Sequence, residues 1–159
     1  MQEQISVFRV TRPAIKGKLQ DPRATYEHFK GQADWDREAM IVIYLNSQNH
    51  IVHQELHSIG SLTSSAIYPR EVMKLALLKS ATALILIHNH PSGDTEPSRA
   101  DREITRDLYR VGKVLDILIH DHIIIGQGVY YSFSEHGLME QIQNEALQAP
   151  LIRSRRGVA

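Results

Sequence analysis

Stretches of apolar residues and stretches with regularly spaced apolar residues follow one another along this chain. Two segments, 39–45 and 81–87, are apolar almost throughout, which is typical of strands buried on both faces. Other segments place apolar residues three or four positions apart, as amphipathic helices do. This alternation indicates an α/β fold, with helices flanking a mixed, curved β-sheet.

Turn and capping residues set the boundaries of the predicted elements. Asp21-Pro22 is a typical N-cap and first-turn pair, so we expect a helix to begin there and to end near Gly31. Residues 46–49 have the composition of a hairpin turn. The predicted strands are 39–46, 50–58, 82–88, 114–119, 122–125 and 129–133, with one more at 5–10. The predicted helices are 21–31, 69–79, 98–112 and 134–147.

One domain is expected from the length and composition of the chain. It has 159 residues, of which 42% are hydrophobic and 23% charged, and these are globular values. We expect residues 1–35 to form an N-terminal arm and a helix packed on the core. Residues 36–147 form the domain that carries the chemistry, and residues 148–159 a flexible tail.

Charge and cysteine content exclude several classes of protein. Lys plus Arg and Asp plus Glu number 18 each, so the formal net charge is zero and does not favour direct binding to nucleic acid. The absence of cysteine excludes disulfides, thiolate zinc sites and the zinc deaminases. Neither a signal peptide nor a membrane helix of roughly 18 apolar residues is visible, so we expect a cytoplasmic protein without membrane contact.

The most specific chemical pattern is H-x-H-x7-S-x-x-D, formed by His88, His90, Ser98 and Asp101. Both histidines lie at the end of the apolar segment 81–87, where an extended backbone directs their rings to one side. Two imidazoles and a carboxylate are enough for a catalytic zinc site, which has three protein ligands and one open position.

The position of Asp101 in the predicted helix 98–112 supports this interpretation. We expect the apolar stripe of that helix to consist of Ile104, Leu108 and Val111. Asp101 lies three residues before this stripe begins and therefore faces inward. A carboxylate turned toward a core needs a cation or hydrogen-bond donors, and a metal held by the two histidines would supply the cation.

A structural interpretation competes with the metal site. Ser98-x-x-Asp101 alone reads more simply as a helix capping box, and histidines at strand ends are commonly hydrogen-bonded residues at the core edge. Capping explains neither the His-x-His pair nor its position, so the full set favours a metal. The contiguous string His-Asn-His does not indicate an HNH nuclease, in which these residues are dispersed.

The stretch HNHPSGDTEPSRAD, residues 88–101, resembles the JAMM motif of the JAB/MPN zinc metallopeptidases, and specifically their RadC branch. Residues 68–72 (YPREV) and 121–126 (DHIIIG) match as well, so the resemblance covers about residues 35–138. It implies a cytidine-deaminase-like layered fold. It also implies a metalloprotease-type hydrolase of amide or isopeptide bonds, with a peptide or protein substrate.

The resemblance also implies roles for individual residues. Zn²⁺ would be bound by His88, His90 and Asp101, and Ser98 would hydrogen-bond near the metal-bound water. The family uses an upstream glutamate, just before a strand, as general acid and base. Glu38 fits this position, whereas its competitors Glu71 and Glu96 read as a helix first-turn acid and a solvated loop acid.

A second histidine pair, His120 and His122, flanks Asp121. By strand parity the two rings share a face, so a second metal site is one interpretation. We favour a polar turn between two strands, with His122 lining the site from outside the ligand set.

Two other functions remain open. One is a role in DNA repair or mobile elements, as for RadC-type proteins, which usually carry a helix-hairpin-helix module that we do not find in this sequence. The other is a non-catalytic scaffold, since metal-free relatives of this fold exist. The exposed edges of a mixed sheet would allow a homodimer.

Overall fold

The computed structural model describes residues 21–60 and 67–148. Its centre is a five-stranded sheet in the order β2-β1-β3-β4-β5. The strands are β1 (Ala39–Leu45), β2 (Ile51–Ile59), β3 (Ala83–Asn89), β4 (Leu118–Ile125) and β5 (Tyr130–Ser132). The helices are α1 (Pro22–Phe29), the short 3-10 helix η1 (Lys30–Asp34), α2 (Pro69–Leu78), α3 (Arg99–Leu115) and α4 (Leu138–Gln148).

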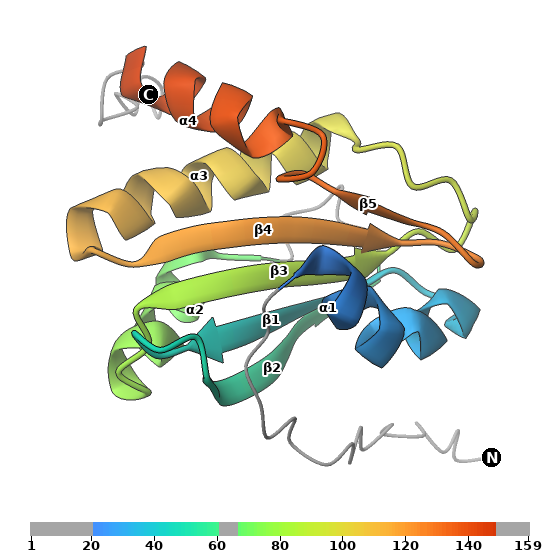
Figure 1. Cartoon of the computed structure of the whole chain (residues 1–159), viewed down its shortest axis with the longest axis horizontal. Coiled ribbons are helices and arrows are strands. Elements are labelled where there is room, and N and C mark those ends of the chain that lie inside the picture. Colours follow the sequence, from blue (N-terminus) through green and yellow to red (C-terminus); the bar gives the residue numbers. More distant parts are fainter. Residues whose placement is uncertain (1–20, 61–66, 149–159) are drawn as a thin grey trace, which may run out of the picture.

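The sheet is mixed, as expected. β1 runs antiparallel to both β2 and β3, β3 runs parallel to β4, and β5 returns antiparallel to β4. The parallel pair is joined through α3, which packs back over the sheet (Figure 1). The α/β architecture predicted from the hydrophobic pattern is therefore confirmed.

Helices cover both faces of the sheet. On one face α2, α3 and α4 pack against alternate residues of β1 and β3, including Met40, Val42 and Leu86. On the other face α1 packs through Tyr26 and Phe29 onto the remaining residues of the same strands. Every residue of β1 and β3 is buried, because these two strands lie inside the sheet between covered faces.

Two predicted boundaries are wrong around the end of α3. The segments 114–119 and 122–125 do not form two strands, because α3 continues to Leu115 and a single strand, β4, follows. The helix ends at Asp116, whose backbone is left-handed with φ of 55°, and not at Gly112. Gly112 stays inside the helix because its missing side chain leaves room for the returning chain at Ile117.

The inward stripe of α3 also differs from the predicted one. The buried residues of this helix are Asp101, Thr105, Leu108 and Gly112. Val111 is 37% exposed, and Ile104 is only partly buried against the core. The inward position of Asp101 is confirmed, and the stripe around it contains a threonine and a glycine that hydrophobicity alone does not reveal.

Some expectations lie outside the described residues. These are the strand at 5–10, the arm before residue 21 and nearly all of the tail after residue 147. Within residues 21–60 and 67–148, no helix combines the length and apolar character needed to cross a bilayer.

Candidate metal centre

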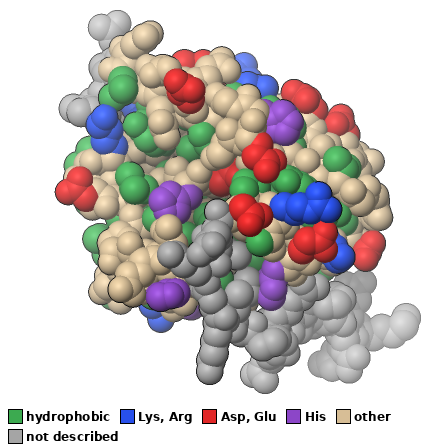
Figure 2. Space-filling model, in the orientation of Figure 1, with side chains coloured by type: hydrophobic (Ala, Val, Ile, Leu, Met, Phe, Trp, Pro, Cys, Tyr) green, Lys and Arg blue, Asp and Glu red, His purple; other side chains and the backbone are tan. Residues whose placement is uncertain are grey.

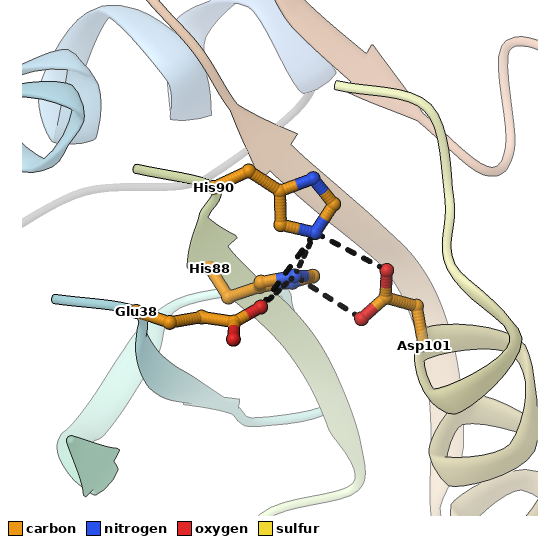
Figure 3. A group of neighbouring side chains, drawn as sticks. All are labelled: Glu38, His88, His90 and Asp101. Atoms are coloured by element: carbon orange, nitrogen blue, oxygen red, sulfur yellow. Dashed lines mark hydrogen bonds and ion pairs between the residues drawn. The ribbon is translucent and has the colours of Figure 1, made fainter. Parts of the chain in front are cut away.

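Four side chains from three parts of the sequence meet at one end of the sheet (Figure 3). Glu38 immediately precedes β1, His88 lies in β3, His90 follows that strand directly, and Asp101 lies in the first turn of α3. Each offers one ligand atom, and these atoms all lie within 4.8 Å of one another. The structure thus brings together the two histidines, the aspartate and the upstream glutamate singled out from the sequence.

Strand pairing explains why Glu38 reaches the histidines across fifty residues of sequence. β1 begins where β3 ends, with Met40 opposite His88 in the antiparallel register. Glu38 Oε1 lies 3.7 Å from Nε2 of His88 and 3.7 Å from Nε2 of His90. The carboxylate therefore faces both imidazoles from the side opposite α3 (Figure 3).

The donor atoms have the spacing of a metal site. Nε2 of His88 lies 2.8 Å from Nε2 of His90 and 3.1 Å from Asp101 Oδ1, and Nε2 of His90 lies 3.3 Å from Asp101 Oδ2. In a tetrahedral zinc site with bonds of about 2.1 Å, neighbouring donors are roughly 3.4 Å apart. A small outward adjustment of the rings would accommodate a cation.

Asp101 gives an independent test of this fit. Its side chain is completely buried, and Oδ1 has no hydrogen-bond partner although it faces the imidazole of His88. Burial raises the pKa of the Asp101 carboxyl, but the neighbouring imidazoles of His88 and His90 outweigh burial and hold this pKa far below its usual range. A buried, ionised carboxylate with an unused oxygen is suited to binding a cation.

His90 also presents the correct nitrogen. Its Nδ1 lies 2.6 Å from the carbonyl oxygen of Asp94, which can only accept, so Nδ1 carries the proton and Nε2 carries the lone pair. Burial lowers the pKa of His90, but the nearby Asp101 and the Asp94 carbonyl outweigh it and raise the pKa in the absence of a cation. The loop after β3 thus fixes the tautomer through its backbone.

The backbone on either side of Glu38 is held by Asn89, a residue to which the sequence analysis gave no role. Asn89 Nδ2 donates to the carbonyl of Arg37 at 2.9 Å, and Oδ1 accepts from the amide of Ala39 at 3.0 Å. Gln32 of η1 completes the cluster by donating to Asn89 Oδ1 at 3.2 Å and to the Ala39 carbonyl at 2.9 Å. Strand parity could have indicated this, because Asn89 points away from the histidines that flank it.

Ser98 forms the N-cap of α3. Its Oγ accepts from the amide of Asp101 at 3.1 Å, and Asp101 Oδ2 accepts from the amide of Ser98 at 2.7 Å. Both bonds of the capping box are present. The capping box therefore leaves Asp101 Oδ1 directed at His88, where it could still bind a cation. A role for the Ser98 hydroxyl in the reaction stays a prediction.

The competing glutamates lie outside the cluster. Glu71, in the first turn of α2, pairs with Lys74 at 2.7 Å. Glu96 is exposed in the loop before α3, 3.8 Å from Arg102. Among the described residues, the single group of acids and histidines with metal-site spacing is the one that contains Glu38.

His120 and His122 do not form a second metal site with each other. The pairing of β3 with β4 shifts between Leu84 and Ile85, and this irregularity leaves His120 out of the register. Its ring then contacts Asn49 at the surface, whereas His122 is completely buried beside His88. Simple strand parity failed here because an extra residue reverses which side chains face each layer.

Comparisons with known proteins agree with the motif. A family model described as a RadC-like JAB domain matches residues 19–138. UPF0758 protein STH371 of Symbiobacterium thermophilum is 48% identical over 128 residues, which are 80% of this chain and 55% of that protein. UPF0758 protein YfjY of Escherichia coli K12 is 48% identical over 107 residues, 67% of each chain. A UPF0758 protein of Methanosarcina mazei is 43% identical over 126 residues, 79% of this chain and 55% of that protein. The chain thus spans little more than half the length of most of these relatives.

Proposed function

The chain belongs to the RadC-like JAB domain family, and from this premise we propose that it is a zinc-dependent hydrolase of amide or isopeptide bonds. One observation carries the proposal. Two imidazole nitrogens and a buried carboxylate converge within 3.3 Å of one another, and a second carboxylate faces them at 3.7 Å. Three ligands and a separate acid are the parts that metal-assisted hydrolysis requires.

His88, His90 and Asp101 would hold the cation, since a two-nitrogen, one-oxygen donor set without thiolates suits Zn²⁺. When bound, zinc supplies Lewis acidity and lowers the pKa of a coordinated water. The proton transfers would be carried out by a residue of this chain. Glu38, which is 22% exposed and open to solvent, takes a proton as general base and returns it to the leaving amine as general acid.

Ser98 would assist from the start of α3. Its oxygen already accepts the bond from the Asp101 amide, so its hydroxyl proton is free to be donated. Donation to the oxygen of the scissile carbonyl would stabilise the negative charge that develops there.

A peptide or protein substrate is favoured over nucleic acid. The formal net charge is zero. On the face shown in Figure 2, acidic and basic side chains are interspersed, and no broad basic surface is present among the described residues of that face. Direct binding to phosphate backbones depends on such a surface.

The experiment that tests this function is metal quantification followed by substrate screening. Purified wild type is compared with Asp101→Asn and His88→Ala, and we expect near-stoichiometric zinc in the wild type and a sharp loss in both variants. Peptide and isopeptide substrates are then screened with the zinc-loaded protein. Unchanged zinc content in both variants would refute the site. A zinc-loaded wild type that cleaves no substrate of either kind would favour the scaffold role.

A further inference from the structure

We propose that His122 is a positioning residue that sets the tautomer of His88, so that Nε2 of His88 is the nitrogen left free for a metal. The relevance to catalysis rests on the proposed function. The tautomer itself does not, because it follows from contacts that the protein makes without any cation.

A continuous line of hydrogen bonds connects two of the candidate ligands through the core. Thr105 Oγ1 lies 2.6 Å from the carbonyl oxygen of Asp101 and 2.7 Å from Nδ1 of His122. On the far side of the ring, Nε2 of His122 lies 2.7 Å from Nδ1 of His88. Thr105, His122 and His88 are all completely buried, so water cannot substitute for any of these partners.

The protons in this line can be assigned from the Asp101 end. A carbonyl oxygen only accepts, so the single proton of the Thr105 hydroxyl is donated to Asp101. Thr105 Oγ1 must then accept from His122, and the proton of His122 lies on Nδ1. Complete burial disfavours an imidazolium, so His122 carries this proton alone and its Nε2 is an acceptor.

The assignment of His88 follows directly. Nδ1 of His88 faces an acceptor and must carry a proton. Nε2 of the same ring then holds the lone pair, and this atom faces Asp101, His90 and Glu38 (Figure 3). Metal-binding histidines usually donate their second nitrogen to a carboxylate or a backbone carbonyl. His90 follows that rule through Asp94, whereas His88 relies on a second imidazole.

Packing holds the ring of His122 in place. Phe133, just after β5, stacks on it with ring centroids 4.5 Å apart and an interplanar angle of 24°. Because Thr105 lies one helical turn after Asp101, the same line of bonds ties the backbone of α3 to the ring of a β3 ligand. His122 thereby couples the position of Asp101 to the orientation of His88.

The first test measures the tautomer directly in the metal-free protein. Long-range ¹H–¹⁵N correlation spectra of protein with ¹⁵N-labelled histidine, recorded in the presence of a chelator, distinguish Nδ1–H from Nε2–H. We expect His88 and His122 both to be protonated at Nδ1. A His88 ring protonated at Nε2 in the folded wild type would overturn the inference, whatever the protein hydrolyses.

The second test measures zinc affinity by competition with a chromophoric chelator. His122→Phe keeps an aromatic ring against Phe133 but offers no acceptor, and we expect zinc affinity to fall about 10–100-fold. His122→Gln places an amide oxygen near the lost nitrogen, and it should retain affinity within a few-fold of the wild type. His120→Gln, a change in a surface histidine, is the matched control and should leave affinity unchanged.

The outcomes separate this inference from the proposed function. Folded His122→Phe protein that binds zinc as tightly as the wild type overturns the positioning role. If His122→Phe does not fold, the comparison of His122→Gln with the wild type decides, because a 10-fold or larger loss in folded His122→Gln contradicts the expected rescue. A wild type that binds no zinc refutes the proposed function, while the tautomer spectra still decide the assignment of His88.

Discussion

Side chains alternate in direction along an extended strand, and this alternation gives different roles to three consecutive residues, His88, Asn89 and His90. The two histidines face Asp101 and Glu38, and the asparagine faces the opposite layer, where it holds the backbone around Glu38. A period of two in side-chain direction thus places two candidate ligands and the support for Glu38 in one tripeptide.

Glu38→Gln separates proton transfer from metal binding. The amide keeps the size of the side chain but cannot act as a base, so we expect zinc content to stay at the wild-type level and turnover to fall about 10²–10⁴-fold. Zinc analysis and steady-state assays on a validated substrate check this. Glu71→Gln, which alters an exposed acid outside the cluster, is the control and should leave turnover intact. Wild-type turnover in Glu38→Gln would mean that another group is the base.

At the scale of elements, the site depends on how η1, β1 and β3 are joined at their ends. The connection consists of hydrogen bonds from the side chains of Gln32 and Asn89 to the backbone of residues 37–39. Both side chains are almost completely buried. Side-chain amides can satisfy a donor and an acceptor at once, which is why they suit the end of a sheet where strand pairing stops.

Asn89→Ala should therefore disturb both stability and catalysis. It leaves the Ala39 amide and the Arg37 carbonyl without their partner, and we expect a loss of about 1–3 kcal/mol in the free energy of unfolding. Turnover should fall while zinc content stays near the wild-type level, because Asn89 touches no candidate ligand atom. Urea titration and zinc analysis measure the two effects. A variant that loses zinc but keeps its stability would contradict this role.

The position at which α3 ends also depends on a contact between two elements. A Cβ at position 112 would lie 2.3 Å from the backbone oxygen of Ile117, which cannot move without shifting the entry to β4. Gly112→Ala should cost roughly 1–3 kcal/mol through overpacking. Thermal unfolding should show a lower Tm, by about 2–4 °C per kcal/mol in a domain of this size. Lys113→Ala, at the exposed neighbouring position, should have almost no effect, and equal Tm values for the two variants would contradict the close contact.

At the scale of the whole molecule, the packing of helices on both faces of the sheet buries polar groups as well as apolar ones. His57 and His122 are held in environments where burial lowers their pKa below the ordinary value of 6.5. The pKa of His90 is raised in the absence of a cation, so its effect on the pH dependence of stability is opposite to theirs.

These shifts predict how stability depends on pH in the metal-free protein. Where a histidine has a lower pKa in the folded state, the unfolded chain binds more protons, so stability is full above about pH 6.5 and declines as the pH falls below it. Burial also lowers the pKa of His120, so three such groups stand against His90, and we expect a lower Tm at pH 5.5 than at pH 7.5. His57→Gln should show a smaller difference between the two pH values. A wild-type Tm that is equal or higher at pH 5.5 would contradict the prediction.

The sequence by itself determined the class of fold and the membership of the site. Continuous apolar segments specified the two central strands, because strands buried on both faces leave no polar alternation. The spacing of His88, His90 and Asp101 was enough to group them, since strand and helix periodicity set the direction of each side chain over such short distances. Glu38 was placed by the motif resemblance, and the structure brings it to the same cluster.

Only the tertiary structure decided which residues support the site. The proximity of Glu38 to His88 depends on strand register, and the separation of His120 from His122 depends on an irregularity in β4. The contacts of Asn89 with Arg37 and of His122 with His88 join residues 52 and 34 positions apart. Local periodicity gives at most the face toward which such a side chain points and not its partner, because the contacts form only when packed layers bring distant backbone segments within hydrogen-bonding distance.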